Sequence, residues 1–145
     1  MRDVLRLNGF YYELREIHKG YFPGWRFGQL MHNFREWVVK EKKRDPFYIE
    51  EEEMLEMFRQ YTSAATGKSV RIYFTFGSSE QYPFGREDYV VSEGLDREDA
   101  IRKFRKMYPD VHKGILNCAD WYTEEDFKKH CAEYFSGKEP AVMIR

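Results

Sequence analysis

The segment from Ser69 to Gly94 constrains the fold most, because it predicts two β-strands joined by a long loop. In its first half, apolar side chains alternate with more polar ones, which is typical of a strand with one buried face. The alternating apolar residues are Val70, Ile72, Phe74 and Phe76. Tyr89, Val90 and Val91 form a second, shorter run. The Gly-, Ser- and Pro-rich stretch between the runs is longer than the roughly 2–5 residues of a usual hairpin connection.

Before this segment, apolar residues at helical spacing predict three helices. The first covers about residues 7–18 and ends at Gly20, and the second covers about residues 26–43. Asp45 and Pro46 interrupt the chain, and a third helix opens with the acidic run Glu50 to Glu53. Residues 62–68 have the composition of a linker. We therefore expect a helical subdomain over residues 1–62.

After the two strands, the sequence predicts a helix, a strand, a second helix and a final strand. Asp96 is placed to cap the first helix, which ends at Pro109, and Thr123 to cap the second, which ends at Gly137. The second helix would turn Phe127, His130, Cys131 and Tyr134 inward. The strands are expected over residues 115–122 and 141–144. Residues 69–145 would then form an α+β subdomain of order β-β-α-β-α-β, a small, mostly antiparallel sheet with both helices packed on one face.

Composition narrows the function classes. The 145 residues include 24 basic and 25 acidic side chains, whereas a non-specific nucleic-acid binder normally has a basic excess. No apolar run is long enough to span a membrane, and the N-terminus lacks the pattern of a signal peptide. Two cysteines do not make a disulfide framework in a chain of this size. We expect a cytoplasmic protein with free thiols and no membrane contact.

Cys118 with His130 as its base and Asp120 as the orienting acid is the sharpest enzyme hypothesis. A cysteine beside Leu116 and Ala119 is more often a buried, inert thiol, so we do not predict a catalytic residue. The same thiol with His130 and Cys131 could hold a metal, but the spacing of metal-binding motifs is missing. No metal or other cofactor is therefore predicted.

Two further segments have a functional and a plainer interpretation. Gly77, Ser78 and Ser79, with Gly85 and Arg86, could cradle a phosphate, but no phosphate-binding motif surrounds them, which favours a flexible connection. The predicted helix from Arg97 to Lys106 is locally basic and could contact DNA, although a solvated helix face explains it as well. A small enzyme or nucleotide-binding module and a DNA-binding regulator thus remain alternatives.

Two sets of residues are candidates for contact with a protein partner. Tyr82, Phe84 and Arg86 lie at the tip of the long loop, and interface anchors are enriched in tyrosine, tryptophan and arginine. The acidic run Glu50, Glu51, Glu52 and Glu53 could occupy a basic groove by imitating a phosphate backbone. Packing of the two aromatic residues onto the sheet, and a favourable helix start for the glutamates, are the plainer explanations.

Several sequence stretches are similar to small proteins of phages and integrative elements of Gram-positive bacteria. Residues 26–33 (RFGQLMHN) and 45–51 (DPFYIEE) resemble one module of such proteins, and residues 73–127, from YFTFGS to GILNCADWYTEEDF, resemble a second. No activity is attached to this resemblance, and it implies no catalytic residue. It implies a mobile-element protein, a class in which anti-CRISPR and other host-takeover proteins bind and inhibit a host factor. The predicted function is therefore non-catalytic inhibition of a bacterial host or defence protein, such as a CRISPR nuclease.

Overall fold

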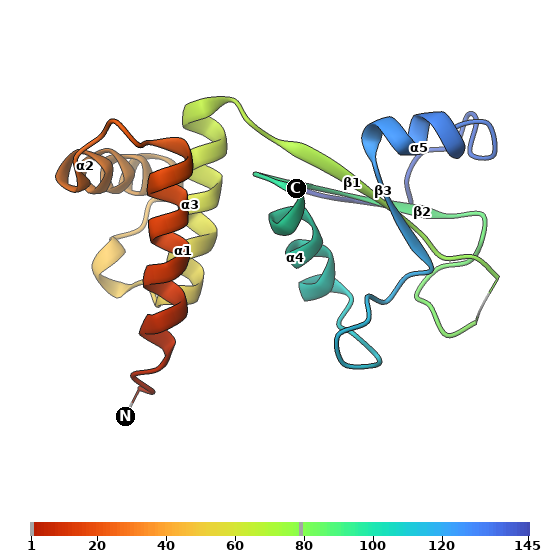
Figure 1. Cartoon of the computed structure of the whole chain (residues 1–145), viewed down its shortest axis with the longest axis horizontal. Coiled ribbons are helices and arrows are strands. Elements are labelled where there is room, and N and C mark those ends of the chain that lie inside the picture. Colours follow the sequence, from red (N-terminus) through yellow and green to blue (C-terminus); the bar gives the residue numbers. More distant parts are fainter. Residues whose placement is uncertain (1, 79) are drawn as a thin grey trace. The chain divides into compact units, whose positions relative to one another are not determined.

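A computed structural model of the chain describes residues 2–78 and 80–145 (Figure 1). It divides into two compact units, Met1–Lys68 and Ser69–Arg145. The first unit is helical, and the second combines helices with a four-stranded sheet. The predicted α+β class is confirmed.

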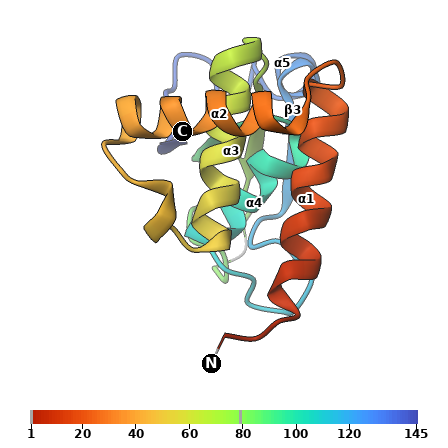
Figure 2. The ribbon, with the colours of Figure 1, turned by 90° about the vertical axis from the view of Figure 1, so that its left-hand side faces the viewer.

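The helical unit contains α1 (Arg6–Tyr21), α2 (Phe27–Trp37) and α3 (Glu51–Thr66). A π-helical turn, Val38–Lys42, continues α2, and a short 3-10 turn, Pro46–Tyr48, precedes α3. Helices α1 and α3 lie side by side and run in the same direction, while α2 crosses them (Figure 2). The N-termini of α1 and α3 are therefore neighbours.

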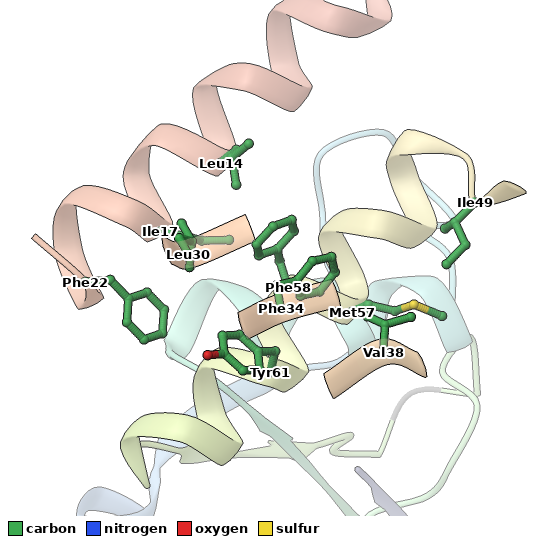
Figure 3. Close-up of a cluster of buried hydrophobic side chains, with 10 residues drawn as sticks. All are labelled: Leu14, Ile17, Phe22, Leu30, Phe34, Val38, Ile49, Met57, Phe58 and Tyr61. Carbon is green, nitrogen blue, oxygen red and sulfur yellow. The ribbon is translucent and has the colours of Figure 1, made fainter. Parts of the chain in front are cut away.

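The core of this unit is rich in aromatic residues. Phe34 of α2 and Phe58 of α3 stack with ring centroids 3.6 Å apart, and both are buried (Figure 3). Tyr61 meets Phe34 edge to face and lies parallel to Phe22, which closes the end of α1. Apolar side chains from all three helices thus surround one pair of stacked rings.

The predicted linker over residues 62–68 is wrong, because α3 continues to Thr66 and ends with Gly67 in a left-handed conformation (φ 72°). Thr62 is fully buried and donates its hydroxyl hydrogen to the carbonyl oxygen of Phe58 (2.7 Å). Thr66 donates in the same way to Thr62 (2.6 Å). The helix accommodates these poor helix formers because their hydroxyl groups bond within it.

The sheet has the strand order β3-β1-β2-β4. Its strands are β1 (Val70–Thr75), β2 (Tyr89–Gly94), β3 (Asp120–Thr123) and β4 (Val142–Ile144). Strand β1 pairs antiparallel with β2 and β3, and β2 pairs parallel with β4, so the sheet is mostly antiparallel as predicted. Helices α4 (Arg97–Met107) and α5 (Glu124–His130) complete the unit.

The prediction that both helices pack on one face is wrong. Phe74 and Val90 point to the face that α4 covers, where Phe104 stacks on Phe74 at 3.8 Å. Tyr73 and Val91 point to the other face, with the α5 residue Phe127. Figure 1 shows α4 and α5 on opposite sides of the sheet. Strand β1 thus places large side chains on both faces of the sheet: Phe74 faces α4, and Tyr73 belongs to a second apolar face.

Both predicted caps are present, but α5 and β3 are shorter than predicted. The side chains of Asp96 and Thr123 accept hydrogen bonds from the backbone N–H groups of Asp99 and Asp126, respectively. Helix α5 ends at His130 rather than at Gly137, so His130 and Tyr134 are exposed instead of turned inward, and Phe135 is buried. The third strand covers only Asp120–Thr123, because the N–H of Cys118 bonds the carbonyl oxygen of Leu116 and bends the chain.

Candidate functional site

The aromatic residues of the long loop fold back onto the sheet. Phe84 lies 5.3 Å from Phe76 and meets Tyr108 edge to face at 5.6 Å, measured between ring centroids. Tyr82 lies beside the same ring of Phe76 at 6.5 Å. Both are half-buried members of the α4-side core. Much of each ring is thus already engaged within the chain, whereas Arg86 in the same loop is exposed.

The acidic run at the start of α3 is largely paired with arginines. Arg2 binds Glu50 through two hydrogen bonds (2.6 and 3.0 Å), and Arg6 binds Glu51 at 2.8 Å. The Arg2 guanidinium lowers the pKa of the Glu50 carboxyl below its ordinary value. Arg44 binds Glu53 at 2.8 Å. The pairs of Arg2 and Arg6 link the start of α1 to the start of α3, and all three pairs reduce the negative field of the run.

The basic side chains of α4 also have partners within the chain. Arg102 pairs with Asp99, Arg105 pairs with Asp110, and Lys103 donates to the carbonyl oxygen of Glu93. The guanidinium of Arg97 lies over the ring of Trp121, 5.7 Å from its centroid. The helix therefore offers fewer free cations to a phosphate backbone than its sequence suggests.

Cys118 and His130 are not brought together. Cys118 is 7% exposed and belongs to the core under α4, whereas His130 is exposed at the end of α5, on the other face of the sheet. Burial, with a smaller effect of Asp120, raises the pKa of the Cys118 thiol to about 11. The thiol is therefore protonated at neutral pH and is a poor nucleophile.

Within residues 2–78 and 80–145, no cluster of three or more His, Cys, Asp or Glu side chains has the arrangement to hold a metal ion. Cys131 and His130 line a common pocket in the α+β unit, but Cys118 does not line it.

None of the described helices combines the length and the apolar character that a membrane span requires.

Two neighbouring aromatic residues that were not among the predicted contacts are the most exposed large apolar side chains among the described residues. Phe47 is 83% exposed and Tyr48 is 77% exposed. They belong to the 3-10 turn Pro46–Tyr48, which begins with the fixed backbone of Pro46. The Asp45 carboxylate accepts a hydrogen bond from the N–H of Phe47 (3.0 Å). The two rings meet edge to face at 4.9 Å, so they form one exposed aromatic pair.

These rings border a cleft of about 570 Å³ between the start of α1 and the start of α3. We call it the aromatic cleft; its apolar lining comprises Leu7, Phe10, Tyr11, Phe47, Tyr48, Ile49 and Met54. The ion pairs of Arg2 with Glu50 and of Arg6 with Glu51 lie at the same cleft. The sequence signal was Asp45-Pro46 directly before two aromatic residues, because an Asp-Pro pair predicts a short turn at this place.

A second pocket, of about 450 Å³, lies in the α+β unit on the α5 side of the sheet. The end of β1, the start of β3, the long loop and the segment after α5 contribute to it. Its polar side chains include those of Arg86, Tyr122, His130, Cys131 and Tyr134. Burial and the neighbouring Cys131 raise the pKa of the Tyr122 phenol, which remains a hydrogen-bond donor at neutral pH.

Comparison with known proteins gives no relative from which a role could be transferred: no family model matches the sequence, and neither a curated protein nor a solved structure matches the chain.

Proposed function

We propose that this protein acts without catalysis, by binding a larger bacterial protein through the aromatic cleft of its helical unit. The observation that supports this most directly is the exposure of Phe47 and Tyr48 side by side, at 83% and 77%. Large exposed apolar patches on a folded protein are typical of interaction sites. Aromatic anchors of this kind provide much of the binding free energy in protein interfaces.

The construction of the turn supports the same function. Pro46 and the Asp45 carboxylate fix the backbone before binding, so little conformational entropy would be lost at Phe47. The apolar lining of the cleft, from Leu7 to Met54, would accept an apolar side chain of the partner. The paired charges at its margin would form a polar rim around that contact.

The proposed partner is a host or defence protein, such as a CRISPR nuclease, and the proposed effect is inhibition. This part rests on the resemblance of residues 26–33, 45–51 and 73–127 to proteins of phages and integrative elements. Residues 45–51 include the turn that exposes Phe47 and Tyr48. The surface we assign to binding is thus part of the stretch that the resemblance singles out.

The test is to capture partners of the tagged chain from a bacterial lysate and to measure the affinity of the recovered protein for single variants. Phe47→Ala and Tyr48→Ala should each weaken binding by about 2 kcal/mol, or roughly 30-fold, because hot-spot aromatic residues reach this value. Tyr12→Ala and Phe27→Ala are matched controls, since these rings are 53% and 57% exposed but do not line the cleft. Equal affinities in all four variants, or no retained protein, would overturn the proposal.

A further inference from the structure

The pocket of the α+β unit is rich in hydrogen-bond donors. The turn after strand β1, in which Gly77 has a φ of 60°, contributes the hydroxyl of Ser78. Tyr122 of β3 and Tyr134, which follows α5, add phenol hydroxyls, and Arg86 adds a guanidinium. Asp120 is the one carboxylate among the residues that line the pocket. A ligand that fits this lining must therefore be rich in acceptors.

Arg86 is the cation that the fold leaves available at this pocket. Most of the described arginines form an ion pair with a carboxylate inside the chain. Among residues 2–78 and 80–145, Arg86 is exposed and has no such partner. A guanidinium offers several N–H donors in a planar fork that matches the oxygens of a phosphate or a carboxylate.

The walls of the pocket favour a ring. Tyr122, Tyr134 and Phe135 line it, and Tyr134 and Phe135 meet edge to face at 4.8 Å. Tyr134 is exposed at 57%, so one side of its ring is open to a ligand. The volume of about 450 Å³ lies within the range of roughly 300–1,000 Å³ that small-molecule sites occupy.

We infer that this pocket is a binding site for a small organic anion with a planar ring, distinct from the protein-binding cleft of the helical unit. The acidic group of the ligand binds Arg86, and its ring lies against Tyr134. Asp120 accepts a hydrogen bond from a hydroxyl or amino group of the same molecule. Ring-bearing phosphates, such as nucleoside monophosphates, and aromatic carboxylates share this chemistry.

The thiol of Cys131 provides a reporter, because it lines the pocket and is only partly buried. The rate at which Cys131 is alkylated can be measured by mass spectrometry of the peptide that contains it. The measurement is made with one probe at a time at millimolar concentration: AMP, GMP, UMP, 4-hydroxybenzoate or inorganic phosphate. A ring-bearing anion should slow the alkylation several-fold, and calorimetry with the same probe should give its dissociation constant. Comparison of the nucleotides with 4-hydroxybenzoate tells which acidic group the pocket prefers.

Two variants and one control separate the contacts. Arg86→Gln should lower the affinity for every anionic probe by about ten- to a hundredfold, because a charge-assisted hydrogen bond is lost. Tyr134→Ala should weaken the ring-bearing probes but leave inorganic phosphate unchanged. Arg26→Gln, at an exposed arginine outside the pocket, should change neither. The inference would be overturned if no probe slowed the alkylation of Cys131 or gave a heat of binding, or if wild type and Arg86→Gln bound the probes with equal affinity. Neither result would affect the protein-binding proposal.

Discussion

Two pairs of aromatic residues next to a proline have opposite fates in this protein. Tyr82 and Phe84 flank Pro83 in the long loop and pack back onto Phe76. Phe47 and Tyr48 follow Pro46 in a three-residue turn and remain exposed. Both segments combine proline with large rings, so composition alone does not distinguish a packing loop from a presenting turn.

The difference comes from what each segment can reach. The loop over residues 76–88 is long enough to return to the α4-side core, where Phe76, Phe104 and Tyr108 provide a platform. The turn at residues 46–48 leaves two consecutive rings exposed and in contact with each other, and Ile49, which follows at once, takes the buried position. The longer segment thus brings its rings to a buried platform, whereas the three-residue turn does not.

The largest expected effect comes from removal of the platform. Phe104 is fully buried and stacks on Phe74, so Phe104→Ala should lower the free energy of unfolding by about 3–5 kcal/mol. Phe58→Ala is the matched change in the helical unit, where the ring stacks on Phe34 at 3.6 Å. Urea unfolding followed by circular dichroism measures both. A cost below about 1 kcal/mol for Phe104→Ala would show that the loop aromatics have no rigid support there.

The next effect concerns pH, because the two units differ in the groups that titrate at alkaline pH. Burial raises the pKa of Cys118 from its ordinary 9.0 to about 11, so the folded state holds this proton more tightly than the unfolded state. The contribution is complete below pH 9 and is lost as the pH rises to about 11. This contribution to the free energy of unfolding amounts to about 3 kcal/mol.

Burial also raises the pKa values of Tyr89, Tyr108 and Tyr122 in the α+β unit. In the helical unit, burial raises the pKa of Tyr61. Urea titrations of the wild type and of Cys118→Ala at pH 8 and at more alkaline pH should therefore show a smaller loss of stability in the variant. Identical losses would mean that the thiol is not buried as the structure describes.

The direct test of the comparison sets one ring of each pair against the other. Phe84 is half-buried, so Phe84→Ala should cost about 1–2 kcal/mol of stability, less than a fully buried phenylalanine. Phe47→Ala should change stability by less than about 0.5 kcal/mol, because its ring contacts mainly solvent. Thermal unfolding of both variants decides the matter. A reversed order would exchange the roles that we give to the two segments.

The sequence contained the elements of this fold more clearly than their packing. The alternation of Ile72 and Phe74 and the caps at Asp96 and Thr123 predict the correct elements, since these are local signals. The face of the sheet that a helix covers is not local: it depends on whether Tyr73 or Phe74 lies below that helix. The bend at Cys118, which shortens β3, likewise leaves no periodic signal.

The candidate contact residues show the same division. The acidic run at Glu50 to Glu53 is visible in the sequence, but its neutralisation depends on Arg2 and Arg6, more than forty positions away. The turn that carries Phe47 has a local signal in Asp45 and Pro46, but the sequence does not show that its ring lacks a buried platform. The sequence singles out Arg86 only by its place in the long loop. That Arg86 has no carboxylate partner among the described residues emerges only when the whole unit is folded.

The smallest expected effect tests whether the acidic run belongs to the scaffold of the aromatic cleft or to the contact itself. Arg6 and Glu51 are partly buried and 2.8 Å apart, so a double-mutant cycle with Arg6→Gln and Glu51→Gln should give a coupling energy of about 0.5 kcal/mol. Salt should reduce this coupling, since part of the pair faces water. Glu52→Gln is the matched control, because no arginine partner of Glu52 occurs in the described part of the chain. If Glu52→Gln lowered the affinity for the captured partner more than Phe47→Ala did, the contact would be the acidic run rather than the aromatic turn. The exposed rings would then need another explanation.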